Sequence, residues 1–337
     1  MRLICAPMAT LSHEAFRRTA ERFPGCDEYF TEMINAPSLL NMGPFEKYYL
    51  MSGPCPEKIV WQLTGNKAEP MAEAVGILSS KGGLGIDLNM GCSAPQIYKT
   101  GAGISWMLKP ISETERLVKS VRKAIDSSGA NLRLSVKCRL GADDFTDDTF
   151  FNFTDMLFAS GVDMISLHPR TIKEKLRGLP RYDYAEKLAL RNPDKEIVVN
   201  GEIRDASSLK IAMGKVPHAK AAMIGRAAAQ KPWIFSSLKK SLAQDENQDE
   251  TLDENPGEEK IDAMETALFF LKSVMECQPE EFWRTRIQRF FSYYCDNFSF
   301  GHYFKMQLLN FHSVEETEEK IRKYFDQCPD DRWVKSI

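Results

Sequence analysis

Short β-prone runs alternate regularly with amphipathic segments through most of this chain, and this alternation constrains the fold more than any other feature. Eight runs have mostly apolar centres, as expected of parallel strands that are buried on both faces. They are residues 3–7, 28–33, 58–63, 85–89, 132–137, 164–168, 196–200 and 221–224. Eight such units over about 240 residues match the roughly 250 residues of a typical (β/α)8 barrel. The sequence therefore predicts an α/β fold of the TIM-barrel type.

A doubly wound parallel sheet is the alternative architecture. Such a sheet normally carries a glycine-rich dinucleotide loop after its first strand, and here that place holds Pro7-Met8-Ala9-Thr10. The barrel is therefore preferred. After the eighth run, Pro232 is expected in the first turn of a short helix, where its missing N–H is tolerated.

Some helix ends are readable between the runs. Residues 112–115, Ser-Glu-Thr-Glu, fit a capping box, and Gly129 is placed to end the helix that follows. Asp147 or Asp148 is expected to start the next helix, and Gly161 to close it.

The last part of the chain reads as a separate, small helical domain. Residues 244–259 are acidic and nearly devoid of apolar groups, which is typical of a linker. Apolar periodicity then resumes. We therefore expect a barrel domain over residues 1–243, an acidic linker over 244–259 and a helical domain over 260–337. With 337 residues, 43% of them hydrophobic, the chain has ample apolar content for these cores.

Several protein classes are disfavoured by the sequence. No stretch approaches the roughly 18 uncharged apolar residues of a membrane span, and the N-terminal segment is too short for a signal peptide. The eight cysteines form no CxxC pair or zinc-like cluster, so we expect no metal and reduced thiols in a cytoplasm. We also expect a monomer. A net charge of −3 argues against a wholly electrostatic nucleic-acid binder but allows a local basic face.

Polar residues stand at the ends of six predicted strands, where the chemistry of such a barrel takes place. The residues at or just beyond these ends are Gln62, Asn89, Lys137, Arg139, His168, Arg170, Asn200, Gly201, Glu202, Gly225 and Arg226. The alternative, in which most of them only cap the barrel with structural hydrogen bonds, stays open. Their convergence favours a binding site at the barrel mouth.

Glycines near the last two strands favour a phosphate-bearing ligand. Gly201 and Gly225 allow the backbone to approach a ligand closely, and this part of a barrel often cradles a phosphate. Arg226 would contact the phosphate. Lys137 and His168 would then reach the middle of the cofactor, where a cation stabilises a reduced flavin ring.

Cys92 lies in a segment between Asn89 and Ile111 that is bracketed by glycines and reads as a mobile loop over the barrel mouth. A loop cysteine is often only a tolerated small residue. Beside a hydride donor, however, a weak acid suits the reduction of a polarised C=C bond. In this context the sequence favours Cys92 as the proton donor.

Seven short motifs, in their order along the chain, resemble those of the tRNA-dihydrouridine synthases. They are Glu32-Met33-Ile34, Gln62-Leu63-Thr64-Gly65, Asp87-Leu88-Asn89-Met90-Gly91-Cys92, Val136-Lys137-Cys138-Arg139-Leu140-Gly141, His168-Pro169-Arg170-Thr171, Asn200-Gly201-Glu202-Ile203 and Met223-Ile224-Gly225-Arg226. Each motif alone is weak, but the ordered set is specific. The helical tail is also similar to the family's layout, in which an FMN barrel precedes a helical tRNA-binding domain.

The resemblance implies an FMN-dependent enzyme that reduces a tRNA uridine to 5,6-dihydrouridine, with NADPH as the reductant. Hydride would pass from FMN N5 to uracil C6, and Cys92 would protonate C5. Asn89, Arg139 and Arg170 would lie near the substrate. The residues that the resemblance assigns to FMN are Pro7, Met8, Gln62, Lys137, His168, Asn200, Gly201, Glu202, Gly225 and Arg226.

The chain departs from the family pattern at three places. Ser93-Ala94 follows Cys92 where the family usually has a proline and a small residue, and Pro169 stands where glycine is usual. Leu176-Arg177-Gly178 replaces a Tyr-x-Gly element. These changes bear on the nucleotide position more than on flavin binding.

Basic and aromatic residues are interleaved over positions 283–294 of the tail. Arg284, Arg286 and Arg289 are expected to contact RNA, although the aromatic residues could equally be core and the arginines solvated. Two other functions remain open. One is a flavin enzyme that reduces a small pyrimidine or enone, with the tail as an oligomerisation or lid element. The other is a non-catalytic RNA-binding protein on a degenerate barrel.

Overall fold

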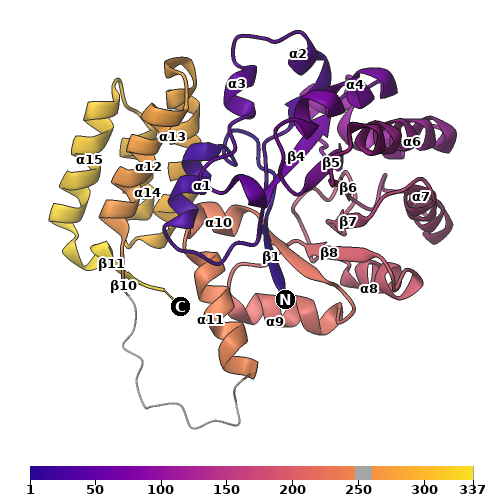
Figure 1. The fold of residues 1–337 in the computed structure, drawn as a ribbon. Coiled ribbons are helices and arrows are strands. Elements are labelled where there is room, and N and C mark those ends of the chain that lie inside the picture. The colour runs from indigo at the N-terminus through magenta and orange to yellow at the C-terminus, as the bar shows by residue number, and fades with distance from the viewer. Residues whose placement is uncertain (247–259, 337) are drawn as a thin grey trace.

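The computed structural model describes residues 1–246 and 260–336, and it contains a closed barrel of parallel strands with a helical domain at its side (Figure 1). All eight predicted strands are present: β1 (Arg2–Cys5), β2 (Glu28–Phe30), β4 (Ile59–Thr64), β5 (Gly85–Met90), β6 (Arg133–Cys138), β7 (Met164–Leu167), β8 (Glu196–Asn200) and β9 (Ala221–Ile224). The ring closes because β1 pairs with both β2 and β9, while β2 pairs with β4. The predicted TIM barrel is confirmed, and the doubly wound alternative is wrong. The short β3 (Ile34–Asn35) extends β4 outside this ring.

The barrel interior is apolar near its centre and polar toward the carboxyl ends of the strands. The apolar cluster consists of Ile4, Ala6, Phe30, Val60, Met164, Val198, Ala221 and Met223. The strand register aligns Gln62 with Asp87, Asp87 with Ser135, and Asn89 with Lys137. Because side chains alternate between the two faces of a strand, these polar residues share the inner face.

Helices follow the strands of the barrel, and most of them cover its outer face. They are α1 (Glu14–Glu21), α2 (Ala36–Leu40), α3 (Glu46–Tyr49), α4 (Ala68–Ser79), α5 (Pro95–Tyr98), α6 (Ile111–Ser128), α7 (Asp147–Ala159), α8 (Tyr182–Arg191), α9 (Ala206–Lys215), α10 (Arg226–Gln230) and α11 (Ile234–Glu246). One face of α6 is apolar and buried, with Leu117, Val118, Val121 and Ile125 all inaccessible to solvent. Most of the core lies in this layer between the helices and the sheet.

Two expected helix starts are wrong. The capping box over residues 112–115 does not form, because α6 already begins at Ile111 and the Glu115 carboxylate accepts from Lys119 instead. The helix expected from Pro232 through Phe235 is present as α11, but it begins two residues later, at Ile234, and a short helix that was not expected, α10, begins directly after β9 at Arg226. The predicted start of α7 at Asp147 and the left-handed stop at Gly129 are confirmed.

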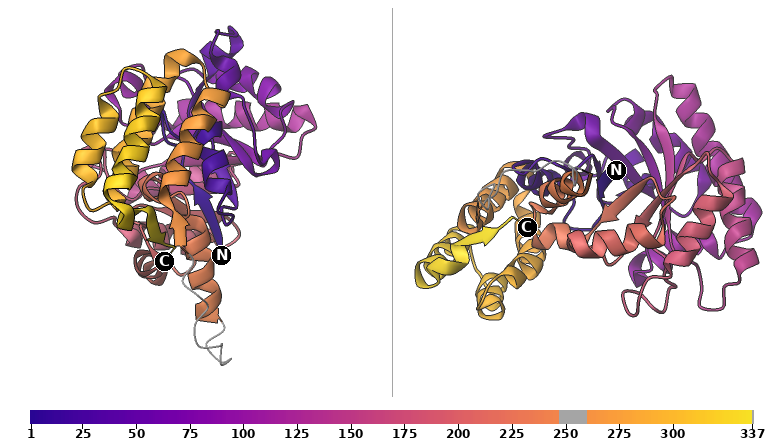
Figure 2. Two further views of the ribbon diagram at one scale, coloured as in Figure 1. Left: turned by 90° about the vertical axis from the view of Figure 1, so that its left-hand side faces the viewer. Right: turned by 90° about the horizontal axis from the view of Figure 1, so that it is seen from below.

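The helical domain packs against one side of the barrel. It contains α12 (Ala263–Cys277), α13 (Glu280–Tyr294), α14 (Gly301–Leu309), α15 (Val314–Gln327) and an antiparallel pair of β10 (Lys260–Asp262) with β11 (Trp333–Lys335). Helix α12 contacts α1, and α13 contacts α10. The views of Figure 2 agree that these helices lie beside the barrel. Stacked aromatic rings, such as Phe270 on Phe290 at 3.7 Å, fill the domain core.

The acidic segment expected at residues 244–259 lies outside the described residues from position 247 onward, while α11 extends to Glu246. No helix in the described part of the chain is long and apolar enough for a membrane span. All eight cysteines are among the described residues, and each is a free thiol.

Candidate active site

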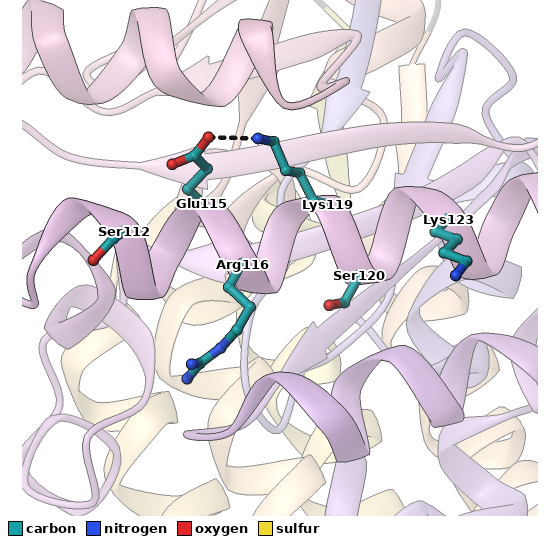
Figure 3. Close-up of a pocket in the computed structure, with 6 residues that line it drawn as sticks. All are labelled: Ser112, Glu115, Arg116, Lys119, Ser120 and Lys123. Atoms are coloured by element: carbon teal, nitrogen blue, oxygen red, sulfur yellow. Dashed lines mark hydrogen bonds and ion pairs between the residues drawn. The ribbon is translucent and has the colours of Figure 1, made fainter.

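A cavity of about 1000 Å³ opens at the carboxyl ends of the barrel strands. Its walls contain most of the site residues predicted from the sequence: Pro7, Met8, Cys92, Lys137, Arg139, His168, Arg170, Asn200, Gly201, Glu202, Gly225, Arg226 and Arg289. A second hollow lies on the outside of α6 (Figure 3) and is lined by Ser112, Glu115, Arg116, Lys119, Ser120 and Lys123. All of these residues belong to one helix surface, so this hollow gathers none of the strand-end groups.

Lys137 supplies an uncommitted positive charge to the cavity. No hydrogen-bond or ion-pair partner contacts its ammonium group among the described residues. Burial lowers the pKa of Lys137 to about 8, and the nearby Arg139 cation acts in the same direction while Asp87 opposes it. The side chain therefore remains mostly protonated at neutral pH and is available to an electron-rich ligand.

His168 is held as a neutral ring. Its Nε2 atom lies 2.9 Å from Nη1 of Arg170, and a guanidinium group only donates. Nε2 must therefore accept, which places the ring proton on Nδ1. Burial, followed by the charges of Lys137 and neighbouring arginines, lowers the pKa of His168 to about 2. The residue can offer one N–H donor without adding a charge.

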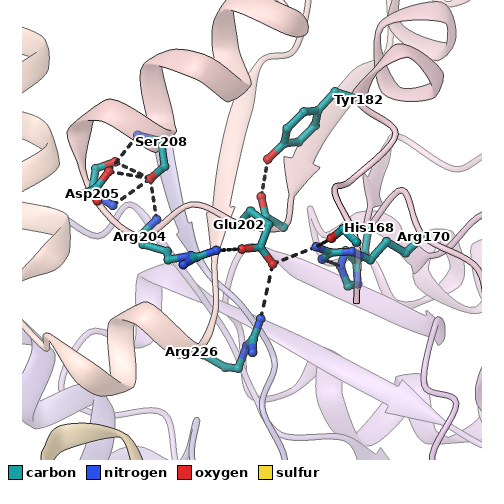
Figure 4. A network of polar contacts seen from close by, with 10 residues as sticks. His168, Arg170, Tyr182, Glu202, Arg204, Asp205, Ser208 and Arg226 are labelled. Atoms are coloured by element: carbon teal, nitrogen blue, oxygen red, sulfur yellow. Dashed lines mark hydrogen bonds and ion pairs between the residues drawn. The ribbon is translucent and has the colours of Figure 1, made fainter. Parts of the chain in front are cut away.

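An ion network fixes the wall formed by the loops after β7 and β8 (Figure 4). Arg170 is fully buried and donates to Glu202 at 2.8 Å as well as to His168 and the Gly178 carbonyl. Glu202 also accepts from Arg204. Burial alone would raise the pKa of Glu202, but these hydrogen bonds outweigh it and keep the pKa low. Arg170 is thus committed to internal contacts.

Backbone geometry at Gly201 requires glycine. Its φ of +124° is unfavourable for other residues, and an added Cβ would lie 3.0 Å from Cδ2 of His168. The Tyr182 hydroxyl donates to the Gly201 carbonyl at 2.5 Å and holds this turn from behind. The amide of the preceding Asn200 donates to the Met223 carbonyl at 2.8 Å, which ties β8 to β9.

Arg226 is the least engaged arginine of this wall. Its side chain is 49% exposed, and its distance to Glu202 is 3.8 Å, against 2.8 Å for Arg170. Arg226 begins α10 directly after Gly225. Its guanidinium group therefore remains free to contact an anion that enters the cavity.

Two side chains hold the backbone around Cys92. The Asn89 amide oxygen accepts from the backbone N–H of Cys92 at 3.0 Å and of Gly91 at 3.3 Å. On the other side, Arg139 donates through Nε to the Gly91 carbonyl at 3.1 Å and through Nη1 to the Lys175 carbonyl at 2.9 Å. Burial, followed by the charge of Arg170, lowers the pKa of Arg139 to about 10. Cys92 itself is half-buried in the cavity wall.

Gln62 and Asn89 lie behind the cavity wall. Gln62 has no exposed surface, and it donates to Asp87 at 2.7 Å while it accepts from Asn89 at 2.8 Å. In this structure both amides contact other side chains of the barrel interior.

The segment between Asn89 and Ile111, expected as a loop over the barrel mouth, contains α5 and a short 3-10 helix, Gly103–Met107. The Trp106 indole in this 3-10 helix donates to the Gly65 carbonyl.

The three arginines of α13 occupy different environments. Arg286 is buried in an ion pair with Glu32 of the barrel, with Phe282 and Tyr49 beside it, and does not reach the cavity. Arg284 is exposed and lies near Phe311. Arg289 is exposed at the cavity, where its guanidinium carbon lies 5.2 Å from the Tyr293 ring centroid. Of the aromatic residues in this segment, Phe290, Phe291 and Tyr294 are core.

Some cavity residues were not predicted from the sequence. They are Ala6, Gly91, Ser93, Ala94, Pro95, Lys175, Leu176, Gly178, Leu179, Ile203, Arg204, Met223, Ala227, Gln230, Tyr293 and Asp296. Arg289 and Tyr293 are four positions apart on one helix, and this spacing could have grouped them on one face. The described residues contain no cluster of His, Cys, Asp and Glu that could hold a metal ion.

Comparison with known proteins identifies the family of this chain. The family model "Dihydrouridine synthase (Dus)" matches residues 4–328. A probable tRNA-dihydrouridine synthase of Aquifex aeolicus is 30% identical over 239 residues, which cover 70% of this chain and 72% of that protein. The tRNA-dihydrouridine synthase B of Vibrio parahaemolyticus is 31% identical over 261 residues, which cover 76% of each chain. This chain belongs to the dihydrouridine synthase family.

Proposed function

We propose that this protein is an FMN-dependent tRNA-dihydrouridine synthase that reduces a uridine of tRNA to 5,6-dihydrouridine, with NADPH as the reductant. Membership of the family supports the reaction, and the names of its relatives support tRNA as the substrate. The observation that carries the proposal is the gathering of three groups around one cavity. These are the unpaired ammonium of Lys137, the neutral ring of His168 and the thiol of Cys92.

The residues of the cavity fit FMN. The Lys137 ammonium has no protein partner and suits the electron-rich edge of a reduced flavin ring. The Nδ1–H of His168 offers a neutral donor beside it. Arg226 and the backbone at Gly201 and Gly225 would hold the phosphate, because there the guanidinium is half exposed and the backbone is free of side-chain bulk. Bound FMN supplies the hydride that is added to C6 of uracil.

We assign the second hydrogen to Cys92. Addition of hydride at C6 leaves negative charge on C5 and on the C4 carbonyl, and the product needs a proton at C5. The Cys92 thiol would donate that proton, and water would restore it afterwards. Asn89 and Arg139 would keep the thiol at the cavity through their bonds to the backbone of residues 91 and 92. We therefore give both residues a positioning role.

The wall from the helical domain favours a large substrate over a free pyrimidine. Arg289, Tyr293 and Asp296 line the same cavity as the barrel residues, so a ligand in the cavity meets both domains. An exposed arginine beside an aromatic ring suits an unstacked base and its phosphate. We propose that residues 1–243 carry catalysis in the cytoplasm and that residues 260–337 bind tRNA, with Arg284 and Arg289 as phosphate contacts.

The two half-reactions test this function separately. Purified protein is loaded with FMN, reduced anaerobically with NADPH and then mixed with unmodified tRNA while flavin absorbance is followed. Cys92→Ser should keep NADPH-driven flavin reduction and lose about 10²- to 10⁴-fold of the rate of reoxidation by tRNA, the usual contribution of a general acid. Cys328→Ser, which alters another half-buried thiol in the helical domain, is the control and should match the parent in both steps.

Two results would contradict the proposal. A Cys92→Ser enzyme that tRNA reoxidises as fast as the parent removes Cys92 as the acid. A parent enzyme that reduces a free pyrimidine or an enone efficiently, but not tRNA, assigns the cavity to a small-molecule reductase instead.

A further inference from the structure

A chain of hydrogen bonds runs from the barrel interior to the backbone of Cys92. Gln62 Nε2 donates to Asp87 Oδ2 at 2.7 Å, and Asn89 Nδ2 donates to Gln62 Oε1 at 2.8 Å. Asn89 Oδ1 then accepts from the N–H groups of Gly91 and Cys92. Three successive hydrogen-bond steps, through the side chains of Gln62 and Asn89, thus connect a buried carboxylate with the loop that carries the thiol.

The strand register builds this chain into the barrel. Asp87 on β5 lies between Gln62 on β4 and Ser135 on β6 in one layer of the interior. Asn89 is two residues further along β5, so it lies on the same inner face and closer to the cavity. Gln62, Asp87 and Ser135 have no exposed surface. Rigid strands therefore hold every member except the loop itself.

Burial of the Asp87 carboxylate in the barrel interior costs free energy. Its carboxylate accepts from Gln62 and from the Ser135 hydroxyl at 2.8 Å, and it has no ion-pair partner among the described residues. Two neutral donors compensate a buried charge only in part. An asparagine would fit the same space without that charge. The carboxylate should therefore do something that an amide cannot.

A carboxylate and an amide differ in whether they donate or accept hydrogen bonds. A carboxylate only accepts, so Gln62 must turn Nε2 toward Asp87 and Oε1 toward Asn89. Asn89 must then turn Nδ2 toward Gln62, which leaves Oδ1 facing the N–H groups of residues 91 and 92. An amide at position 87 could donate as well as accept, and both orientations of Gln62 would become available. A reversed Asn89 would set its own N–H donors against those of the loop.

We propose that Asp87 is a positioning residue for Cys92, whose carboxylate fixes the orientation of the Gln62 and Asn89 amides and thereby holds the Cys92 backbone at the cavity. This inference rests on the proposed role of Cys92 in the reaction. The placement of the loop, however, is measurable without tRNA or NADPH. Loop order and reaction can therefore be tested independently.

The first test replaces the carboxylate by Asp87→Asn and measures two properties of the loop. Amide hydrogen exchange of a peptide that covers residues 89–94 should accelerate by roughly 5- to 10-fold, the factor expected for the loss of one hydrogen bond. The rate at which iodoacetamide alkylates Cys92 should change with it. Ser135→Ala removes the other hydrogen bond to Asp87 without offering Gln62 a new orientation, so this control should keep the parent's exchange at residues 91 and 92.

The second test exchanges the two groups. In the double variant Asp87→Asn/Gln62→Glu, the amide at 87 donates to the carboxylate at 62, which still accepts from Asn89. This variant should return exchange and alkylation to the parent's values, whereas Gln62→Glu alone, which sets two carboxylates face to face, should disturb both. The comparison of Gln62→Glu with the double variant remains informative even if Asp87→Asn fails to fold.

Two outcomes would overturn the inference. In one, Asp87→Asn leaves exchange and alkylation unchanged. In the other, the double variant fails to restore them, so the direction of the amides is not what matters. With tRNA, Asp87→Asn should slow flavin reoxidation without changing the Kd for tRNA. If the parent does not reduce tRNA but the loop responds as described, the proposed function fails and the positioning role stands.

Discussion

The electrostatic state of Asp87 gives a quantitative prediction about stability. Burial raises the pKa of Asp87 from 3.8 to about 6, although hydrogen bonds from Gln62 and Ser135 act against the rise. The folded protein therefore binds a proton at this carboxyl before the unfolded chain does as the pH falls. This group thus makes the fold more stable on acidification from pH 6 toward pH 4, and the gain disappears as the pH rises through about 6.

The expected size follows from the two pKa values. At pH 7.5 the carboxyl is ionised in both states and contributes almost nothing to the pH dependence. At pH 5 the folded state holds the proton and the unfolded chain largely does not, which stabilises the fold by about 1.4 kcal/mol relative to pH 7.5. Asp87→Asn cannot titrate, so it should lack this contribution. The difference in unfolding free energy between the parent and the variant should shift by about 1.4 kcal/mol in the parent's favour.

Urea unfolding of both proteins at pH 7.5, 6.0 and 5.0 measures this shift. Other carboxyls, such as Glu202 with its lowered pKa, titrate equally in the two proteins and cancel in the difference. A difference that stays constant between pH 7.5 and 5.0 would mean that Asp87 has the same pKa in the folded and unfolded states, contrary to this prediction.

Three further predictions follow from single contacts. Arg286→Ala should destabilise the protein by about 3–5 kcal/mol in urea unfolding, since it leaves Glu32 buried without its partner, whereas the exposed Arg284→Ala should stay within about 0.5 kcal/mol of the parent. Gly201→Ala should release FMN more readily than Gly178→Ala in a fluorescence titration. Both glycines have a positive φ, but only at Gly201 would the new methyl group meet His168. Lys137→Met should weaken FMN binding or slow its reduction by NADPH, and unchanged values for both would remove Lys137 from the site.

The barrel was predictable because each of its strands carries its own signal. Parallel strands that are buried on both faces need apolar centres, and eight such runs stand out at a regular spacing. Among the predicted strand ends, that of β2 is the least accurate, because the strand stops at Phe30 and not at Met33. The reason is a contact that lies far away in the sequence, because Glu32 leaves the sheet to pair with Arg286 and to accept from the Thr10 backbone N–H.

Strand ends also made much of the cavity predictable, since a closed barrel brings the ends of all its strands to one face. What a residue contacts there was not predictable. Gln62 and Arg170 look equally available for a ligand in the sequence. In the structure, however, Gln62 is hydrogen-bonded to Asp87 and Asn89, and Arg170 to His168 and Glu202. Such pairings depend on the register between strands, which the sequence of one strand does not contain.

The contacts made by residues of the helical domain were not predictable from the sequence either. Three arginines of one helix read alike in the sequence, but the helix presents Arg286 to the barrel and Arg289 to the cavity. Only the docking of the domain against α1 and α10 decides which face is which.

The mass of the RNA product shows whether this protein reduces a uridine of tRNA. An unmodified tRNA transcript is incubated with the purified protein, FMN and NADPH, then digested and analysed by mass spectrometry, with a Cys92→Ser reaction beside it. We expect one uridine whose mass has increased by that of a hydride and a proton, in the parent reaction and far less in the variant. A transcript whose uridines are all unchanged after NADPH has reduced the bound flavin would contradict this expectation.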